Sequence, residues 1–211
     1  MYNRIHYAEE IEVNRSVQRT EYDLQNIKTN MIVKTRDWAN WTESYNFLIN
    51  KNGQFSKENL SSYAMTNLNV DAIFYIRYDN KFSGGYYFDR RLHVTDIQFS
   101  ALWRKYLSDP KFVQKVRNTG PLSAFMRIDN RLLLIGAAPV HKSDGTGRDE
   151  GILVIGRHMA KDTITNEMRL HGEWIFDQGP DGTTTKRIQF NQSNTRITLP
   201  VNAHDGAAVA W

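Results

Sequence analysis

Polar and aromatic residues that recur at strand spacing could form a small-molecule site on one face of a predicted sheet. Three pairs are each spaced two residues apart: Tyr75 with Arg77, Tyr87 with Asp89, and Phe125 with Arg127. Side chains two apart in a strand lie on the same face. If Ala72, Phe74 and Ile76 face a covering helix, the paired residues share the other face. Arginine could bind a carboxylate there through two hydrogen bonds. The alternative is a solvated sheet face whose ion pairs add little stability.

Other residue types give weaker chemical patterns. The loop from Ser143 to Glu150 holds two aspartates and a glutamate, but they do not alternate as in a calcium loop, and Arg148 interrupts them. This favours a plain hairpin turn. The histidines, at positions 6, 93, 141, 158, 171 and 204, show no metal-ligand spacing, and the chain has no cysteine. No nucleophile elbow, phosphate loop or zinc-protease motif occurs. We therefore predict no catalytic residue, no metal and no cofactor.

Length and composition fit one folded domain with an appendage. The chain has 211 residues, of which 40% are hydrophobic. Its 27 basic and 23 acidic residues are scattered, which argues against a nucleic-acid partner. The sequence contains neither a run of apolar residues long enough to span a membrane nor the apolar core of a signal peptide.

A long helix is predicted to position the sheet. Apolar or aromatic residues recur every seven positions at Val17, Leu24, Met31, Trp38 and Tyr45, with a second series at Ile27, Trp41 and Leu48. Neither proline nor glycine occurs between Met1 and Asn52, so one helix about 70 Å long is expected. We predict that the projecting part forms a homodimer through Val17, Leu24, Ile27 and Met31.

The aromatic part of the same helix is predicted to pack on the sheet. Trp38, Trp41 and Tyr45 lie on neighbouring turns, where such a stripe usually forms a core face. A ligand-stacking role is the alternative. The expected signalling route is a shift of this helix against the sheet, which the projecting helix then carries onward.

The remaining sequence predicts an α+β fold. Strand patterns cover residues 72–78, 84–89, 122–128, 132–141 and 151–158, which gives a five-stranded antiparallel sheet with helices over one face. Helical spacing covers residues 56–67, 94–107, 111–117 and 160–170. Gly53 is expected to end the long helix in a left-handed conformation. After Gly172, short strand-like pieces at 174–176, 187–190 and 195–199 lack a core of their own. Residues 207–211 resemble a truncated strand or the approach to a membrane.

Four motifs follow one another in order along the chain: Asp37-Trp38-x-x-Trp41-x-x-x-Tyr45-x-Phe47, Asn59-Leu60, Asn69-Val70-Asp71-Ala72-Ile73, and Pro139-Val140-x-x-Ser143-Asp144-Gly145-x-Gly147-x-x-x-Gly151-x-Leu153-x-x-Gly156-Arg157. Each piece alone is common, but their order and spacing together are much more specific. The set resembles the fourth class of CHASE domains, the cyclase/histidine-kinase-associated sensory extracellular domains. The resemblance covers about Trp38 to His158, somewhat over half of the chain.

The resemblance implies a PAS- or Cache-like fold, in which a long N-terminal helix leads into a five-stranded antiparallel sheet. Residues 1–36 would be the stalk, residues 37–170 the sensor core, and residues 171–211 a β-rich extension. The implied protein is a prokaryotic receptor, with this periplasmic or extracytoplasmic module held between two membrane helices. Its output would be a diguanylate cyclase, a cyclic-di-GMP phosphodiesterase or a histidine kinase.

Two functions remain open at this point. The first is the sensing of a small molecule, such as an amino acid, a carboxylate, an amine or a purine-like compound; no binding residue transfers from the family by motif. The second is a ligand-free dimerisation or protein-interaction module of a membrane protein. A ligand that prefers the folded state would raise the melting temperature, which distinguishes the two.

Overall fold

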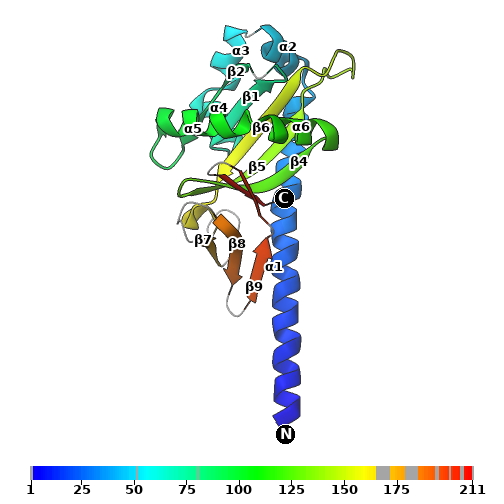
Figure 1. Ribbon diagram of the computed structural model, residues 1–211, viewed down its shortest axis with the longest axis vertical. Coiled ribbons are helices and arrows are strands. Elements are labelled where there is room, and N and C mark those ends of the chain that lie inside the picture. The colour runs from blue at the N-terminus through cyan, green and yellow to red at the C-terminus, as the bar shows by residue number, and fades with distance from the viewer. Residues whose placement is uncertain are drawn as a thin grey trace.

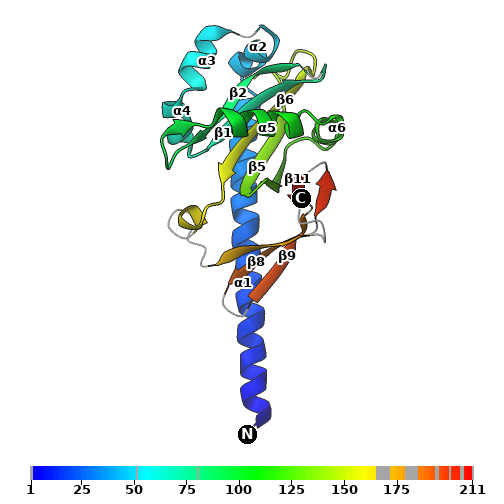
Figure 2. The same cartoon turned by 60° about the vertical axis from the view of Figure 1, so that its left-hand side comes forward.

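The computed structural model describes residues 2–50, 52–79, 81–164, 172–178, 185–192, 195–199, 201–204 and 207–210. A long helix runs along an α+β body and a small second sheet, and its N-terminal part extends past both (Figures 1 and 2). The predicted α+β class is confirmed. Among the described helices, none is both long and apolar enough to cross a membrane.

The large sheet is antiparallel and has eight strands, in the order β10-β11-β4-β5-β6-β1-β2-β3. The five predicted strands are its adjacent central members: β4 (Leu122–Ile128), β5 (Arg131–Pro139), β6 (Gly151–His158), β1 (Ala72–Arg77) and β2 (Phe82–Asp89). The sheet is wider than predicted because β3 (Val94–Thr95), β10 (Asn202–His204) and β11 (Ala207–Ala210) extend its edges. The apolar run at 207–210 is therefore a strand, paired with β4.

The predicted continuous helix is two helices, α1 (Tyr2–Ala39) and α2 (Thr42–Asn50). Hydrogen bonds from the distant β5–β6 loop accompany the break between them. His141 N donates to Ala39 O over 3.0 Å, and Thr42 N donates to Ser143 Oγ over 3.1 Å. The break between α1 and α2 thus coincides with tertiary contacts. It contains neither proline nor glycine, the residues that usually indicate a helix break in a sequence.

The stripe predicted to form a dimer interface packs within its own chain. Leu24 and Met31 are each only 4% exposed, Ile27 packs against the same core, and Val17 is half-buried. α1 contacts β5 of the large sheet and β9 (Thr195–Leu199) of the small one. Leu24 and Met31 are thus buried against the sheets of their own chain. Dimerisation stays a prediction.

Helices cover both faces of the large sheet, not one as predicted. α1 and α2 lie on one face, and α5 (Ile97–Leu107) and α6 (Pro110–Thr119) lie on the other (Figure 1). β1 shows the consequence, since five successive residues from Ala72 to Ile76 are buried. Alternate residues of this strand pack into two separate cores. A strand buried on both faces reads as a nearly continuous apolar run.

Side-chain caps set the boundaries of the shorter helices. The predicted helix over 56–67 is two helices, α3 (Gly53–Asn59) and α4 (Ser62–Leu68), capped by Asn52 and Ser61. Gly53 begins α3 and does not have the left-handed conformation expected of it. Of the predicted helix at 160–170, Lys161 to Ile164 are helical and residues 165–170 lie outside the described residues.

The three strand-like pieces near the C-terminus form an antiparallel sheet of β7 (Glu173–Gln178), β8 (Thr185–Gln192) and β9. Their buried side chains Ile188, Phe190 and Ile197 belong to the core beneath α1. The small sheet therefore shares its hydrophobic core with the body, as expected for a segment without a core of its own.

Candidate ligand-binding site

The six residues predicted to form a site do not share a face. The register of β1 and β2 pairs Ala72 with Tyr87 and Tyr75 with Gly84. Directly paired residues lie on the same face. Tyr87 therefore lies with Ala72 and Phe74 beneath α5, whereas Tyr75 faces α1 and α2. The predicted shared face would need Tyr87 opposite a residue on the Tyr75 side of β1, whereas Tyr87 lies opposite Ala72. A shift of one residue in register moves every side chain of a strand to the other face.

Tyr75 and Arg77 hold α2 against the sheet. The Tyr75 hydroxyl shares a 2.9 Å hydrogen bond with Ser44 Oγ, and burial raises the pKa of this tyrosine. Arg77 donates from Nη1 to Ile49 O over 3.3 Å and pairs with Asp79 at the same distance. These contacts are structural, and neither residue lines the pocket described below.

Phe125 and Arg127 contact the small sheet instead. The Phe125 ring lies 4.7 Å from the Trp174 ring, and the Arg127 guanidinium lies 4.6 Å from the centre of the Phe176 ring. Both residues therefore join β4 to β7. Of the six predicted site residues, Tyr87 and Asp89 are thus the two that lie on the α5 face.

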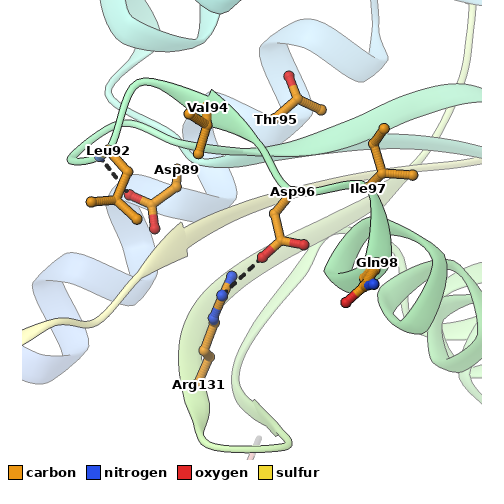
Figure 3. Close-up of a pocket in the computed structure, with 8 residues that line it drawn as sticks. All are labelled: Asp89, Leu92, Val94, Thr95, Asp96, Ile97, Gln98 and Arg131. Carbon is orange, nitrogen blue, oxygen red and sulfur yellow. Dashed lines mark hydrogen bonds and ion pairs between the residues drawn. The ribbon is translucent and has the colours of Figure 1, made fainter.

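Asp89 lines a pocket of about 450 Å³ at the end of β2, which we call the Arg131 pocket (Figure 3). Its walls come from the turn after β2, from β3, from the start of α5 and from the first residue of β5. The lining residues are Asp89, Leu92, Val94, Thr95, Asp96, Ile97, Gln98 and Arg131.

Two aspartates shape this pocket through their caps. Asp89 Oδ1 accepts hydrogen bonds from the backbone N–H groups of Arg91 and Leu92, each at 3.0 Å. Its other oxygen points into the space between Asp89 and Arg131 (Figure 3). Asp96 caps α5 by accepting from Phe99 N over 2.9 Å, and its second oxygen pairs with Arg131 Nη2 at 2.8 Å. The turn and the helix start are thus fixed by the carboxylates that face the pocket.

Two aromatic rings flank Arg131. Its guanidinium lies 4.3 Å from the centre of the Phe99 ring and 5.3 Å from that of Tyr87. Stacking of this kind orients an arginine and lowers the freedom it must lose on binding. The floor of the pocket is therefore preorganised.

The rim of the pocket is apolar and exposed. Leu92, Val94 and Ile97 are 66%, 50% and 77% exposed. A second pocket of about 320 Å³ lies next to it, shares Thr95 and Ile97, and is lined by aromatic side chains and Arg104. The arrangement could hold a small molecule that carries both a charged group and an apolar part.

A buried polar network supports the pocket from below. Tyr87 Oη lies 3.4 Å from His158 Nδ1, and His158 N donates to Asp71 Oδ2 over 2.7 Å. Asp71 Oδ1 accepts from Arg90 Nε over 2.9 Å, and Arg90 also donates to Asn69. Burial lowers the pKa of His158, and the negative charge of Asp71 opposes this shift. In the described part of the chain, no group of three or more side chains could hold a metal.

We expect stability to fall as pH falls below about 6.5, the pKa of His158 in the unfolded chain. Because burial lowers the folded pKa, the unfolded chain binds a proton here that the folded chain does not. This contribution is complete above the unfolded pKa and is lost progressively down to the lowered folded value. Urea unfolding between pH 5 and 8 should show it, and His158→Gln should have a shallower slope. Equal slopes for the two proteins would contradict the assignment.

The predicted signalling face straddles the break between α1 and α2. The Trp38 and Trp41 rings lie 5.9 Å apart in an edge contact, and Trp41 lies 5.7 Å from Phe55 of α3. Tyr45 is buried in the core of the α1 face. These contacts confirm packing. The passage of a signal through this face stays a prediction.

Most residues of the Arg131 pocket were not predicted from the sequence. Asp96 carried a readable signal, since an aspartate that precedes a helical pattern is a common cap. Arg131 lies between the predicted strands at 122–128 and 132–141, outside both of them. Nothing in the local sequence joins the two residues, because the order of strands β5, β6, β1 and β2 brings them together.

Comparison with known proteins identifies the family. The profile of the CHASE4 domain matches residues 24–170, which include α2 to α6, the strands β1 to β6 and the Arg131 pocket. The chain is also similar to the methanogenesis regulatory histidine kinase FilI of Methanothrix harundinacea (strain 6Ac), with 28% identity over 168 residues. That match covers 78% of this chain and 18% of the relative, so the chain spans under one fifth of the relative's length. With most of its length matched by the family profile, the chain belongs to the CHASE4 domain family.

Proposed function

We propose that this chain is the extracytoplasmic sensory input domain of a receptor histidine kinase, and that it binds a small molecule in the Arg131 pocket. Membership of a sensory domain family supports the class of function, and similarity to a histidine kinase supports that output over a cyclase or a phosphodiesterase. The observation that carries the site is the preorganised Arg131–Asp96 pair under an apolar rim. Membrane anchoring on both sides of the domain rests on the family resemblance.

The charges of the pocket favour an organic amine among the candidate ligands. Asp89 and Asp96 contribute two carboxylates, and Arg131 contributes one guanidinium, which already pairs with Asp96. A carboxylate ligand would add a third negative charge beside them, whereas an ammonium group could pair with Asp89. The rim of Leu92, Val94 and Ile97 would cover the apolar part of the ligand.

A thermal-shift screen of this chain tests the proposal. A ligand at a hundred times its dissociation constant stabilises the folded state by about 2.7 kcal/mol, or roughly 5–10 °C for a chain of this size. We expect hits among primary and secondary amines with an apolar group. Asp89→Asn should abolish them, because asparagine keeps the oxygen that caps the turn but loses the charge.

Arg77→Gln, outside the pocket, is the control and should retain every hit. Hits that survive Asp89→Asn would place the binding site elsewhere. Hits confined to carboxylates would overturn the amine assignment but not the sensory function.

The exposed rim favours a second candidate, a protein-interaction module without a small ligand. Three large apolar side chains gather at one edge of the sheet, and patches of this kind often mark a contact with another protein. A screen without any hit, combined with loss of signalling after Ile97→Asp in the full-length receptor, would favour this candidate.

A further inference from the structure

The loop between β5 and β6 makes a compact set of contacts with the break between α1 and α2. Thr42 N donates to Ser143 Oγ over 3.1 Å, and Ser143 N donates to Thr42 Oγ1 over the same distance. The two side-chain oxygens lie 3.2 Å apart. His141 N donates to Ala39 O, the last residue of α1. Ser143 thus caps α2, while His141 satisfies a carbonyl at the end of α1.

The same loop also packs on the first turn of α2. A β-carbon on Gly147 would lie 3.0 Å from the Tyr45 ring, and Gly147 has a φ of 96°. Lys142 Nζ lies 5.3 Å from the centre of the same ring. The loop therefore fits against one orientation of α2 and has little room to fit another.

These contacts are weak enough to open. Thr42 and Ser143 lie at the exposed surface, where water competes for each hydrogen bond. A neutral bond of this kind changes an opening equilibrium by roughly three- to tenfold. Several together reach the range of ordinary allosteric coupling, roughly 5- to 150-fold. A set of bonds of this strength suits a switch.

The hairpin connects this loop to the Arg131 pocket. β5 begins at Arg131, in the pocket, and leads to the loop; β6 returns from the loop to His158, beside Tyr87. β5 and β6 are paired from Leu133 with His158 to Pro139 with Ile152. A hairpin that is hydrogen-bonded along this length is a contiguous element of the kind that can couple its two ends.

We propose that the β5–β6 loop is a latch that sets the angle between α1 and α2, and that the β5–β6 hairpin links this latch to the Arg131 pocket. Closed, the Ser143–Thr42 pair holds the break in the observed geometry. Open, α2 loses its cap and the loop no longer fixes the angle between α1 and α2. The role of the latch in signalling rests on the proposed sensory function. The existence of the latch does not, because it is tested without a ligand.

Amide hydrogen exchange of this chain tests the latch. Ser143→Ala removes the oxygen that accepts from Thr42 N, so exchange at residues 42–45 should rise about tenfold, with an unchanged urea midpoint. Thr146→Val is the matched control, because the Thr146 hydroxyl bonds only Asp144 in the described structure. Exchange that stays unchanged in Ser143→Ala, or rises equally in Thr146→Val, would overturn the latch.

Arg131→Gln tests the link between the two ends of the hairpin. This substitution removes the ion pair with Asp96 at the far end of the hairpin, and we expect at least a threefold change in exchange at residues 42–45. Lys81→Gln, which removes an exposed surface charge, should produce none. No change with Arg131→Gln would overturn the link while leaving ligand binding in the pocket to be decided separately by the thermal-shift screen.

Discussion

Gly136→Ala is expected to destabilise the fold by about 1–3 kcal/mol, because α1 lies too close to β5 for any side chain at this position. A β-carbon there would lie 2.1 Å from Thr35 Oγ1 and 2.9 Å from both Cγ and the carbonyl oxygen of Met31. Rotation of the Thr35 side chain would carry a cost, since its hydroxyl donates to Met31 O and the Thr35 and Met31 side chains are both buried. The helix backbone itself must move. The melting temperature should fall by roughly 3–10 °C.

Gly53→Ala is the matched control for this substitution. Gly53 is the first residue of α3, has no heavy atom within 4 Å of an added β-carbon, and does not have a positive φ. Alanine there should be neutral or stabilising by up to about 1 kcal/mol. Urea unfolding of both variants provides the measurement. If Gly136→Ala and Gly53→Ala have the same urea midpoint, α1 is not packed tightly on β5. A shift of the sheet could then not be transmitted to α1 through this contact.

The strands were predictable because their signals are local. β4 and β6 have the bounds expected from the sequence, 122–128 and 151–158, since turn residues flank each apolar run. β1 also follows from its apolar run. The alternation within it indicates two faces, but not which helices cover them. That assignment depends on the register of β2, which the sequence between the two strands did not indicate.

The break in the long helix could not be predicted from residues 1–52. Neither proline nor glycine occurs at Asn40 or Trp41, and the apolar spacing runs through them. The partner that marks the break is Ser143, about a hundred residues away. The same limit explains the dimer prediction: spacing identified Leu24 and Met31 as buried residues, but it could not distinguish a second copy from the chain's own sheets.

The Arg131 pocket shows how little of a candidate binding site can be predicted from local sequence. Asp89 was singled out by its spacing with Tyr87, and both residues do lie on the α5 face. Arg131 and Asp96 are polar residues at element ends, which are frequent in any sequence. Their pairing needs four strands in the observed order, so it becomes visible only when the sheet is assembled.

Asp71→Ala is expected to have the largest effect of any single substitution considered. The carboxylate is 6% exposed and accepts from Arg90 Nε and from the backbone of His158. It thereby joins the start of β1 to the end of β6 and to the turn after β2. Removing the carboxylate breaks a buried ion pair and takes away the acceptor of the His158 N–H, which costs about 3–5 kcal/mol. The melting temperature should fall by roughly 10 °C or more.

Two further substitutions test whether the effect of Asp71→Ala comes from the burial of this carboxylate and not from the loss of a carboxylate in general. Asp71→Asn keeps one acceptor oxygen, so we expect a smaller loss than with alanine. Asp79→Ala removes an exposed carboxylate that pairs with Arg77 and Lys81, and it should change stability by less than about 1 kcal/mol. If Asp71→Ala proves as mild as Asp79→Ala, the Asp71 network does not hold β1 and β6 together. The support it provides beneath Tyr87 and the Arg131 pocket would then have to come from the aromatic packing of Tyr87 on Phe99, at 4.9 Å between ring centres.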